Sequence, residues 1–264
     1  MAFTYTGSTT FAEAVDREVV EFNLTTTTGV TVGMILVTPG EIMQVRAIPV
    51  AGRVSVRRGY QGSFAGPHNS GETLYFGNPS DYAQIKDSTD RLFGPSFKLP
   101  DVCIPGVRGI DMRGYEYILV DSTATIVPGA TVLISKDGTF TASVLTSAGA
   151  GSVGILMEDA TSNQWAWAMI RGLHTHVKLG SGSSLMTSTG VLAAASSVST
   201  PAVGLIGLTT SVGGTSLMAT TPSVIYRMWP TSAVSSASTS ATSETGAFCS
   251  AWLEYPFMQR RITS

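Results

Sequence analysis

The sequence predicts an all-β protein: two small β-barrel or sandwich domains, joined by an extended segment and followed by a C-terminal arm. Short runs of alternating apolar and polar residues recur along the 264-residue chain, separated by glycine- and proline-rich turns. A strand unit is also repeated in the second half. We expect a β module over residues 1–78, an extended connector over 79–110, a second β domain over 111–228, and a linker with an aromatic arm over 229–264.

A β-hairpin is the strongest local signal in the first module. Residues 42–48 alternate between two faces, Pro49 to Gly52 supply a turn, and Val54 and Val56 continue the alternation. Residues 18–24 and 30–37 are further extended runs. Five or six short strands before Asn78 are enough for a small barrel or sandwich.

One short helix is expected near the N-terminus. Thr9 or Thr10 would cap it, and Phe11, Ala14 and Val15 would share one face.

A glycine-rich loop follows the hairpin and has a recognisable pattern. Its glycines allow positive φ on either side of one aromatic ring. The defining positions are Arg58, Gly59, Tyr60, Gly62, Ser63, Ala65, His68 and Gly71. The hairpin and this loop, residues 41–74, resemble a small β module of tailed-bacteriophage virion proteins, which include head decoration proteins and inserted domains of capsid proteins. The resemblance implies structural roles, with Tyr60 plugging one end of a barrel and His68 bonding to backbone; a catalytic His68 is the alternative.

This resemblance implies a structural virion protein that decorates the capsid as a cement protein. It would bind the outer surface of the head, bridge neighbouring capsomers and assemble as a homotrimer. Its partners would be the major capsid protein and copies of itself, on a virion made in a bacterial cytoplasm. Two alternatives stay open: a neck, tail or fibre-attachment component, and a host-surface module that binds glycans.

Composition bounds the possible partners. Only 13% of residues are charged and the net charge is −2, so no basic surface for nucleic acid is expected. The paired arginines at 57–58 and 260–261 are too short for a binding patch. No apolar run approaches the ~20 residues of a membrane helix, and the N-terminus lacks the features of a signal peptide.

Residues that could carry chemistry are few. Cys103 and Cys249 lack metal-ligand spacing, and two buried thiols are expected. His174 and His176 form an H-x-H without a third ligand; a ring of them on a three-fold axis that binds an ion is a secondary hypothesis. Neither a phosphate-binding loop nor a G-x-S-x-G elbow occurs. We therefore expect no catalytic, cofactor or metal site, and no enzyme.

The connector and the C-terminal segment are rich in large apolar residues. Prolines and glycines interrupt residues 78–109, which favours an extended segment packed on another surface. The Ser/Thr/Ala tract over 231–246 precedes a cluster of aromatic residues, which favours an arm that clasps a neighbouring subunit. The alternative is a last strand that returns to its own core. The candidate partner contacts are Phe93, Phe97, Phe248, Trp252, Tyr255 and Phe257.

The second domain contains the internal repeat. Residues 129–142 with 153–156 and residues 182–194 with 203–206 share a strand, a glycine turn, a strand, a small-residue loop and a V-G-[IL]-[LI] strand. Between the copies, residues 164–178 alternate as one long strand or as two strands bent at Gly172. The repeated pattern is similar to β-rich domains of phage capsid-decorating and other virion surface proteins, and it supports an all-β fold.

Overall fold

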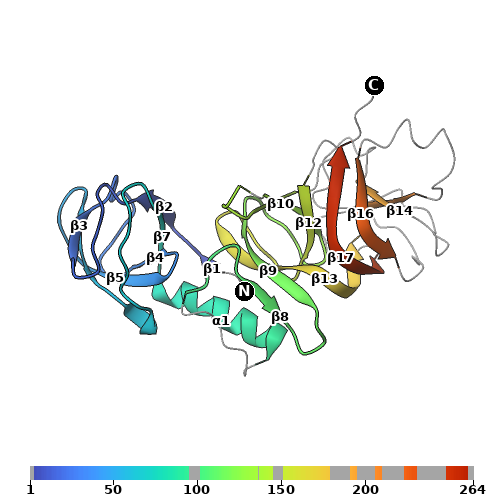
Figure 1. Ribbon diagram of the computed structural model, residues 1–264, viewed down its shortest axis with the longest axis horizontal. Coiled ribbons are helices and arrows are strands. Elements are labelled where there is room, and N and C mark those ends of the chain that lie inside the picture. Colours follow the sequence, from blue (N-terminus) through green and yellow to red (C-terminus); the bar gives the residue numbers. More distant parts are fainter. Residues whose placement is uncertain are drawn as a thin grey trace. The chain divides into compact units, whose positions relative to one another are not determined.

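The computed structural model confirms an all-β fold with two domains (Figure 1). It describes residues 3–94, 102–135, 137–144, 151–178, 191–194, 206–209, 223–230 and 248–260. Strands make up 49% of the fold. Unit 1 comprises Met1–Ile104 with Asn163–Trp165, and unit 2 comprises Pro105–Ser162 with Ala166–Ser264.

Unit 1 is built on a six-stranded sheet that curls into a half-barrel, in the order β2-β7-β4-β5-β6-β3. An antiparallel bridge between Phe11 and Leu24 continues the pairing beyond the outer strands β2 and β3. Five or six strands were expected before Asn78; this sheet has six, and β1 (Phe3–Thr4) in the other sheet is a seventh. The six are β2 (Gly7–Thr10), β3 (Glu21–Asn23), β4 (Ile35–Thr38), β5 (Glu41–Val50), β6 (Arg53–Arg57) and β7 (Thr73–Gly77).

The predicted hairpin is β5 with β6, and its alternation explains the core. Val54 and Val56 of β6 are buried, whereas Arg53 and Arg57 are exposed. Ala51 and Gly52 form the turn, with Gly52 at φ 84°. Buried residues from β3 to β7 and from the loops between strands meet in one apolar interior. This core consists of Phe11, Val15, Phe22, Leu24, Val30, Leu36, Met43, Val45, Val54, Val56, Leu74 and Phe76.

The predicted N-terminal helix is wrong. Thr9 and Thr10 belong to β2, which pairs with β7, and Val15 bridges His68. Phe11 and Val15 both face the core, as a helix would also have placed them. Their spacing is therefore compatible with both a helix and an extended chain. The extended chain is favoured because pairing with the sheet gives hydrogen-bond partners to backbone groups that would lack them at the end of a helix.

The connector is also corrected, because its first half is a helix and not an extended segment. Helix α1 spans Pro79–Phe93, with Pro79 in its first turn, where a missing N–H costs nothing. Gly94 at φ 87° ends the helix. Its inward residues Tyr82, Ile85, Ser88, Thr89 and Phe93 have helical spacing. No helix among the described residues is both long and apolar enough to cross a membrane.

Unit 2 contains a closed five-stranded barrel in which β13, β9, β11, β10 and β12 follow one another, and β12 pairs again with β13. The barrel strands are β9 (Glu116–Ser122), β10 (Thr131–Ile134), β11 (Thr141–Val144), β12 (Gly151–Leu156) and β13 (Gln164–Lys178). The other strands of this sheet in unit 2 are β8 (Arg108–Ile110), β14 (Val191–Ala194), β15 (Ile206–Thr209), β16 (Ser223–Pro230) and β17 (Phe248–Arg260). Strand β1 (Phe3–Thr4) pairs with the first two residues of β13, and these residues belong to unit 1.

The C-terminal aromatic segment is a strand of its own unit, which corrects the predicted arm. Strand β17 pairs with β13 along Arg171–Lys178, with β12 at Gly151 and Ser152, and with β16. Ala251 and Leu253 of β17 are buried. The alternative of a last strand returning to its own core is therefore the observed structure.

The repeat is only partly visible. In its first copy, β10 pairs on one side with β11 and on the other with β12. In the second copy, β14 pairs directly with β15, and residues 182–190 lie outside the described part. The two copies therefore use similar strands in different pairings. The long alternating run between them is the single strand β13, with Gly172 at φ 123°.

Candidate functional site

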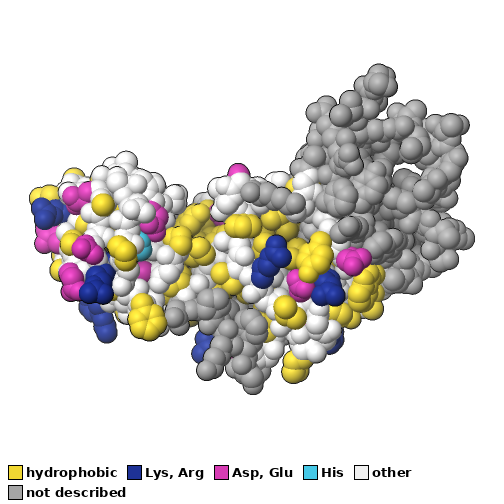
Figure 2. Space-filling view, viewed as in Figure 1, with side chains coloured by type: hydrophobic (Ala, Val, Ile, Leu, Met, Phe, Trp, Pro, Cys, Tyr) yellow, Lys and Arg dark blue, Asp and Glu magenta, His cyan; other side chains and the backbone are white. Residues whose placement is uncertain are grey.

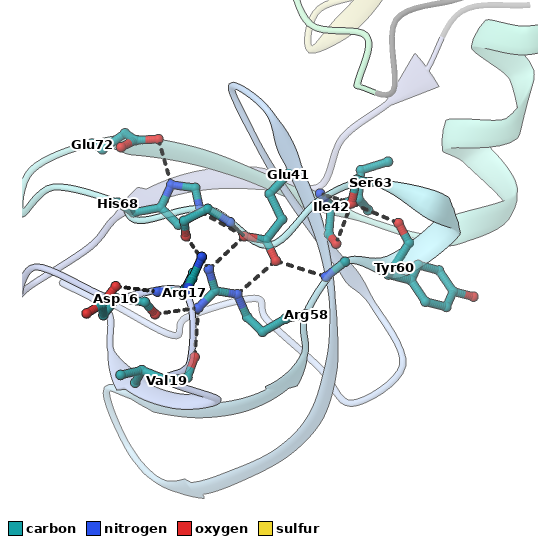
Figure 3. Close-up of polar contacts among 12 residues, drawn as sticks. Asp16, Arg17, Val19, Glu41, Ile42, Arg58, Tyr60, Ser63, His68 and Glu72 are labelled. Carbon is teal, nitrogen blue, oxygen red and sulfur yellow. Dashed lines mark hydrogen bonds and ion pairs between the residues drawn. The ribbon is translucent and has the colours of Figure 1, made fainter.

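A buried cluster of charged residues joins the loop 58–71 to the hairpin in unit 1 (Figure 3). Glu41, the first residue of β5, is fully buried. Its carboxylate accepts two hydrogen bonds from the Arg58 guanidinium, from Nε at 2.8 Å and from Nη2 at 2.7 Å. The backbone amides of Gly59 and Gly66 donate to the same carboxylate at 2.9 and 3.2 Å. The two oxygens of one carboxylate thus hold the start of the loop and its middle, at Gly66.

His68 completes the cluster with two carboxylate partners. Its Nε2 lies 3.0 Å from Glu41 Oε2 and its Nδ1 lies 3.0 Å from Glu72 Oε1. Its ring stacks on Phe11 of the core, with centroids 4.8 Å apart. Both ring nitrogens can donate to carboxylates only when the imidazole is protonated. The geometry therefore favours a buried imidazolium between two acidic groups.

The pKa values of the cluster favour the charged forms. Burial alone would raise the pKa of Glu41, but hydrogen bonds from His68, Arg58 and the two glycine amides outweigh burial and lower it to about 2. Burial would likewise lower the pKa of His68, yet its bonds to Glu41 and Glu72 raise it. At neutral pH Glu41 is a carboxylate whose charge is compensated on all sides.

The remaining bonds of Arg58 and Ser63 tie the loop to other parts of the barrel. Arg58 also donates to the carbonyl oxygens of Asp16, Val19 and Gly66. Ser63 Oγ accepts from the amide of Ile42 at 2.9 Å. Gly59 has φ 59°, and a Cβ there would lie 2.8 Å from the carbonyl oxygen of Ser63. These contacts, with those of His68, explain four positions of the loop pattern: Arg58, Gly59, Ser63 and His68.

The structural interpretation of the loop needs two corrections in detail. The His68 ring bonds to carboxylates, and only its backbone pairs with backbone, at Val15. Tyr60 does not plug the barrel: it is half-buried, its ring points away from Glu41 in Figure 3, and Arg57 lies 5.8 Å from its centroid. Glu41 and Glu72 were not predicted; the signal that could have found them is a buried arginine and histidine that need an anionic partner.

The predicted partner contacts fall into three groups. Phe93 is 6% exposed, so its side chain is not available to a partner as the expected anchor. Trp252 and Tyr255 on β17 are each 40% exposed, so their side chains can meet a partner. Phe97 and the side chains of Phe248 and Phe257 lie outside the described residues.

The H-x-H pair lies on β13 within unit 2. The backbone amide of His176 donates to His174 Nδ1 at 3.2 Å, and burial lowers the pKa of His174 to about 4. Among the described residues, no cluster of three His, Cys, Asp or Glu side chains could hold a metal ion. An ion shared between copies at a symmetry axis stays a hypothesis. Of the cysteines, Cys103 is buried and unpaired, and burial raises its pKa to about 12.

Comparison with known proteins gives no further information: no family model, no curated protein and no solved structure matches this chain.

Proposed function

We propose that this chain is a structural protein of a tailed-phage virion, without enzymatic activity, which decorates the capsid and bridges neighbouring capsomers. Its partners are the major capsid protein and further copies of itself, assembled as a trimer on the outer surface of the head. The observation that carries this proposal is the loop 58–71. The resemblance to virion modules rests on that loop. Arg58, Gly59 and His68, the residues of its pattern that bond to the buried carboxylate of Glu41, stabilise the fold.

The charged cluster supports a structural protein better than an enzyme. A catalytic acid or base must reach its substrate with a free lone pair or proton. Glu41 already accepts five hydrogen bonds, from Arg58 twice, Gly59, Gly66 and His68. The His68 side chain is buried and both its nitrogens are engaged. These groups fix a loop in place, and that loop is what a partner would meet.

Two exposed apolar side chains at the tips of well-fixed loops are the best candidate anchors. Phe64 is 76% exposed and follows Ser63, which is bonded to β5. Met112 is 97% exposed at the tip between β8 and β9. There the carboxylate of Asp111 accepts from the amides of Arg113 and Tyr115, both at 2.9 Å. Anchors that are already ordered lose little entropy on binding.

We expect the double substitution Phe64→Ser with Met112→Ser to weaken binding to capsids by about tenfold or more per site, because each side chain contributes roughly 1–2 kcal/mol when an interface buries it. Both positions are exposed, so the melting temperature should stay close to that of the wild type. The measurement is occupancy of capsids stripped of this protein and titrated with purified chain. The matched control Met112→Leu keeps an apolar anchor and should bind normally. Equal occupancy by the double variant would remove these two anchors from the proposal.

A further inference from the structure

A cleft of about 420 Å³ opens in unit 2 between the barrel and β17. Its floor is apolar and consists of Ile118, Ile134, Val153 and Ile170, all buried. On the face of this unit seen in Figure 2, hydrophobic side chains lie directly beside basic and acidic ones. The volume lies within the range of small-ligand sites, roughly 300–1,000 Å³. Nothing in the charged cluster of unit 1 involves this cleft.

Two aromatic residues line the cleft, and each is held by an unusual backbone. Tyr255 has φ 51° and Phe140 has φ 50°, in the left-handed region that residues other than glycine rarely adopt. Around Tyr255 the pairing of β17 with β16 shifts register, between Tyr226↔Phe257 and Met228↔Leu253. A bulge of this kind re-aims a side chain. Here it places an exposed ring of β17 at the edge of the cleft.

The Tyr255 ring is fixed at its far end as well. Its hydroxyl donates to Glu116 Oε1 at 2.6 Å, and Arg171 Nη1 donates to the same oxygen at 3.0 Å. The bond from Tyr255, together with Arg171, lowers the pKa of Glu116. The Phe140 ring lies against Gly106, where a Cβ would be only 2.5 Å from the ring. Both aromatic walls are therefore ordered before any ligand arrives.

Polar groups around the cleft supply both donors and acceptors with balanced charge. Arg108 lines the cleft, is exposed, and its side chain forms no hydrogen bond or ion pair with any described residue. Ser135 also lines it and donates to Asp137 Oδ1 at 2.6 Å. The two basic groups, Arg108 and Arg171, balance the two acidic groups, Glu116 and Asp137. This arrangement gives no net attraction for either an anion or a cation.

We propose that this cleft binds a neutral saccharide. A sugar ring presents apolar C–H groups on its faces and hydroxyls at its edge. The faces fit the fixed ring of Tyr255 and the apolar floor, while the hydroxyls can accept from Arg108 and exchange hydrogen bonds with Ser135 and Ser152 at the wall. Saccharide binding adds a second activity to a virion component and does not rest on capsid binding.

The test is saturation-transfer NMR on the full chain with glucose, galactose and N-acetylglucosamine in large excess, and with glucuronate and benzoate as charged comparisons. We expect transfer to at least one neutral sugar. Arg108→Gln and Tyr255→Ala should each weaken that binding about fivefold or more. Arg108 is exposed and its side chain has only charge attraction to Glu116, without a hydrogen bond to any described residue, so its variant should fold and tests the site even if Tyr255→Ala fails to fold.

Trp252→Ala is the matched control, because Trp252 lies on the same strand with the same exposed fraction but outside the cleft. It should leave sugar binding unchanged. The proposal is overturned if the folded wild type shows no transfer to any neutral sugar. It is equally overturned if only benzoate or glucuronate binds, or if Arg108→Gln binds the sugar as well as the wild type does.

Discussion

Deleting residues 247–264 is expected to unfold unit 2 and leave unit 1 intact. The deletion removes all of β17, which pairs with β13, β12 and β16. It also exposes the core that Ala251 and Leu253 now cover. A strand with neighbours on both sides satisfies backbone groups that would otherwise be buried without partners, and each such loss costs about 1–3 kcal/mol. Several losses together exceed the 5–15 kcal/mol by which a domain is usually stable.

Hydrogen exchange followed by mass spectrometry separates the two units. Peptides from β13 should lose protection in the deleted chain, whereas peptides from β5 should keep theirs. Deleting only residues 261–264, which follow β17, is the control and should preserve both. If the larger deletion left β13 fully protected, the C-terminal segment would be a dispensable arm and the pairing of β17 would be wrong.

The second large effect is expected for Glu41→Gln, which should destabilise unit 1 by about 3–5 kcal/mol. Gln cannot neutralise Arg58, whose side chain is 6% exposed, nor His68, whose side chain is 3% exposed. Removing one partner of a buried ion pair leaves an uncompensated charge in a medium of low polarity. The control is Glu21→Gln, which breaks the surface pair with Arg53 at 2.9 Å and should cost about 1 kcal/mol or less.

The pH dependence gives this substitution a second readout. The pKa of Glu41 is lowered from 4.5 to about 2, so its stabilising effect is complete above pH 4.5 and is lost as the pH falls towards 2. The pKa of His68 is raised from 6.5, so its contribution is complete below pH 6.5 and is lost as the pH rises through the raised value. Denaturant unfolding should therefore show the wild type losing its advantage over Glu41→Gln on the acid side. A constant difference from pH 7 down to pH 2 would contradict the assigned role of Glu41.

Local patterns predicted the hairpin well and the connector poorly. The alternation is clear in β6, and β5 lies next to it in sequence, so a local pattern is enough to predict their pairing although two register shifts interrupt it. In α1, the inward positions at 82, 85, 89 and 93 include a threonine, and Pro79 stands at the start. Proline usually indicates a break in regular structure, yet it is favoured at the first helical position. The helical period was therefore overlooked.

The charged cluster and the cleft depend on contacts that are distant in sequence. Glu41 is one of 18 acidic residues, and only the fold brings it to His68, 27 positions later. Tyr255 stands in an aromatic segment that looked like an arm, but the bulge that turns its ring is visible only once β16 and β17 are paired. Apolar residues alone do not indicate whether a segment packs into its own core or onto a neighbouring subunit, so the sequence is compatible with both.

The proposed virion role is tested most directly by the copy number of this chain in phage particles purified from cells that carry its gene. Quantitative mass spectrometry would compare its peptides with those of the major capsid protein. A capsid decoration protein predicts a copy number comparable with that of the major capsid protein. A few copies per particle would instead indicate a neck or tail component, and absence from the particles would contradict a structural role in the virion.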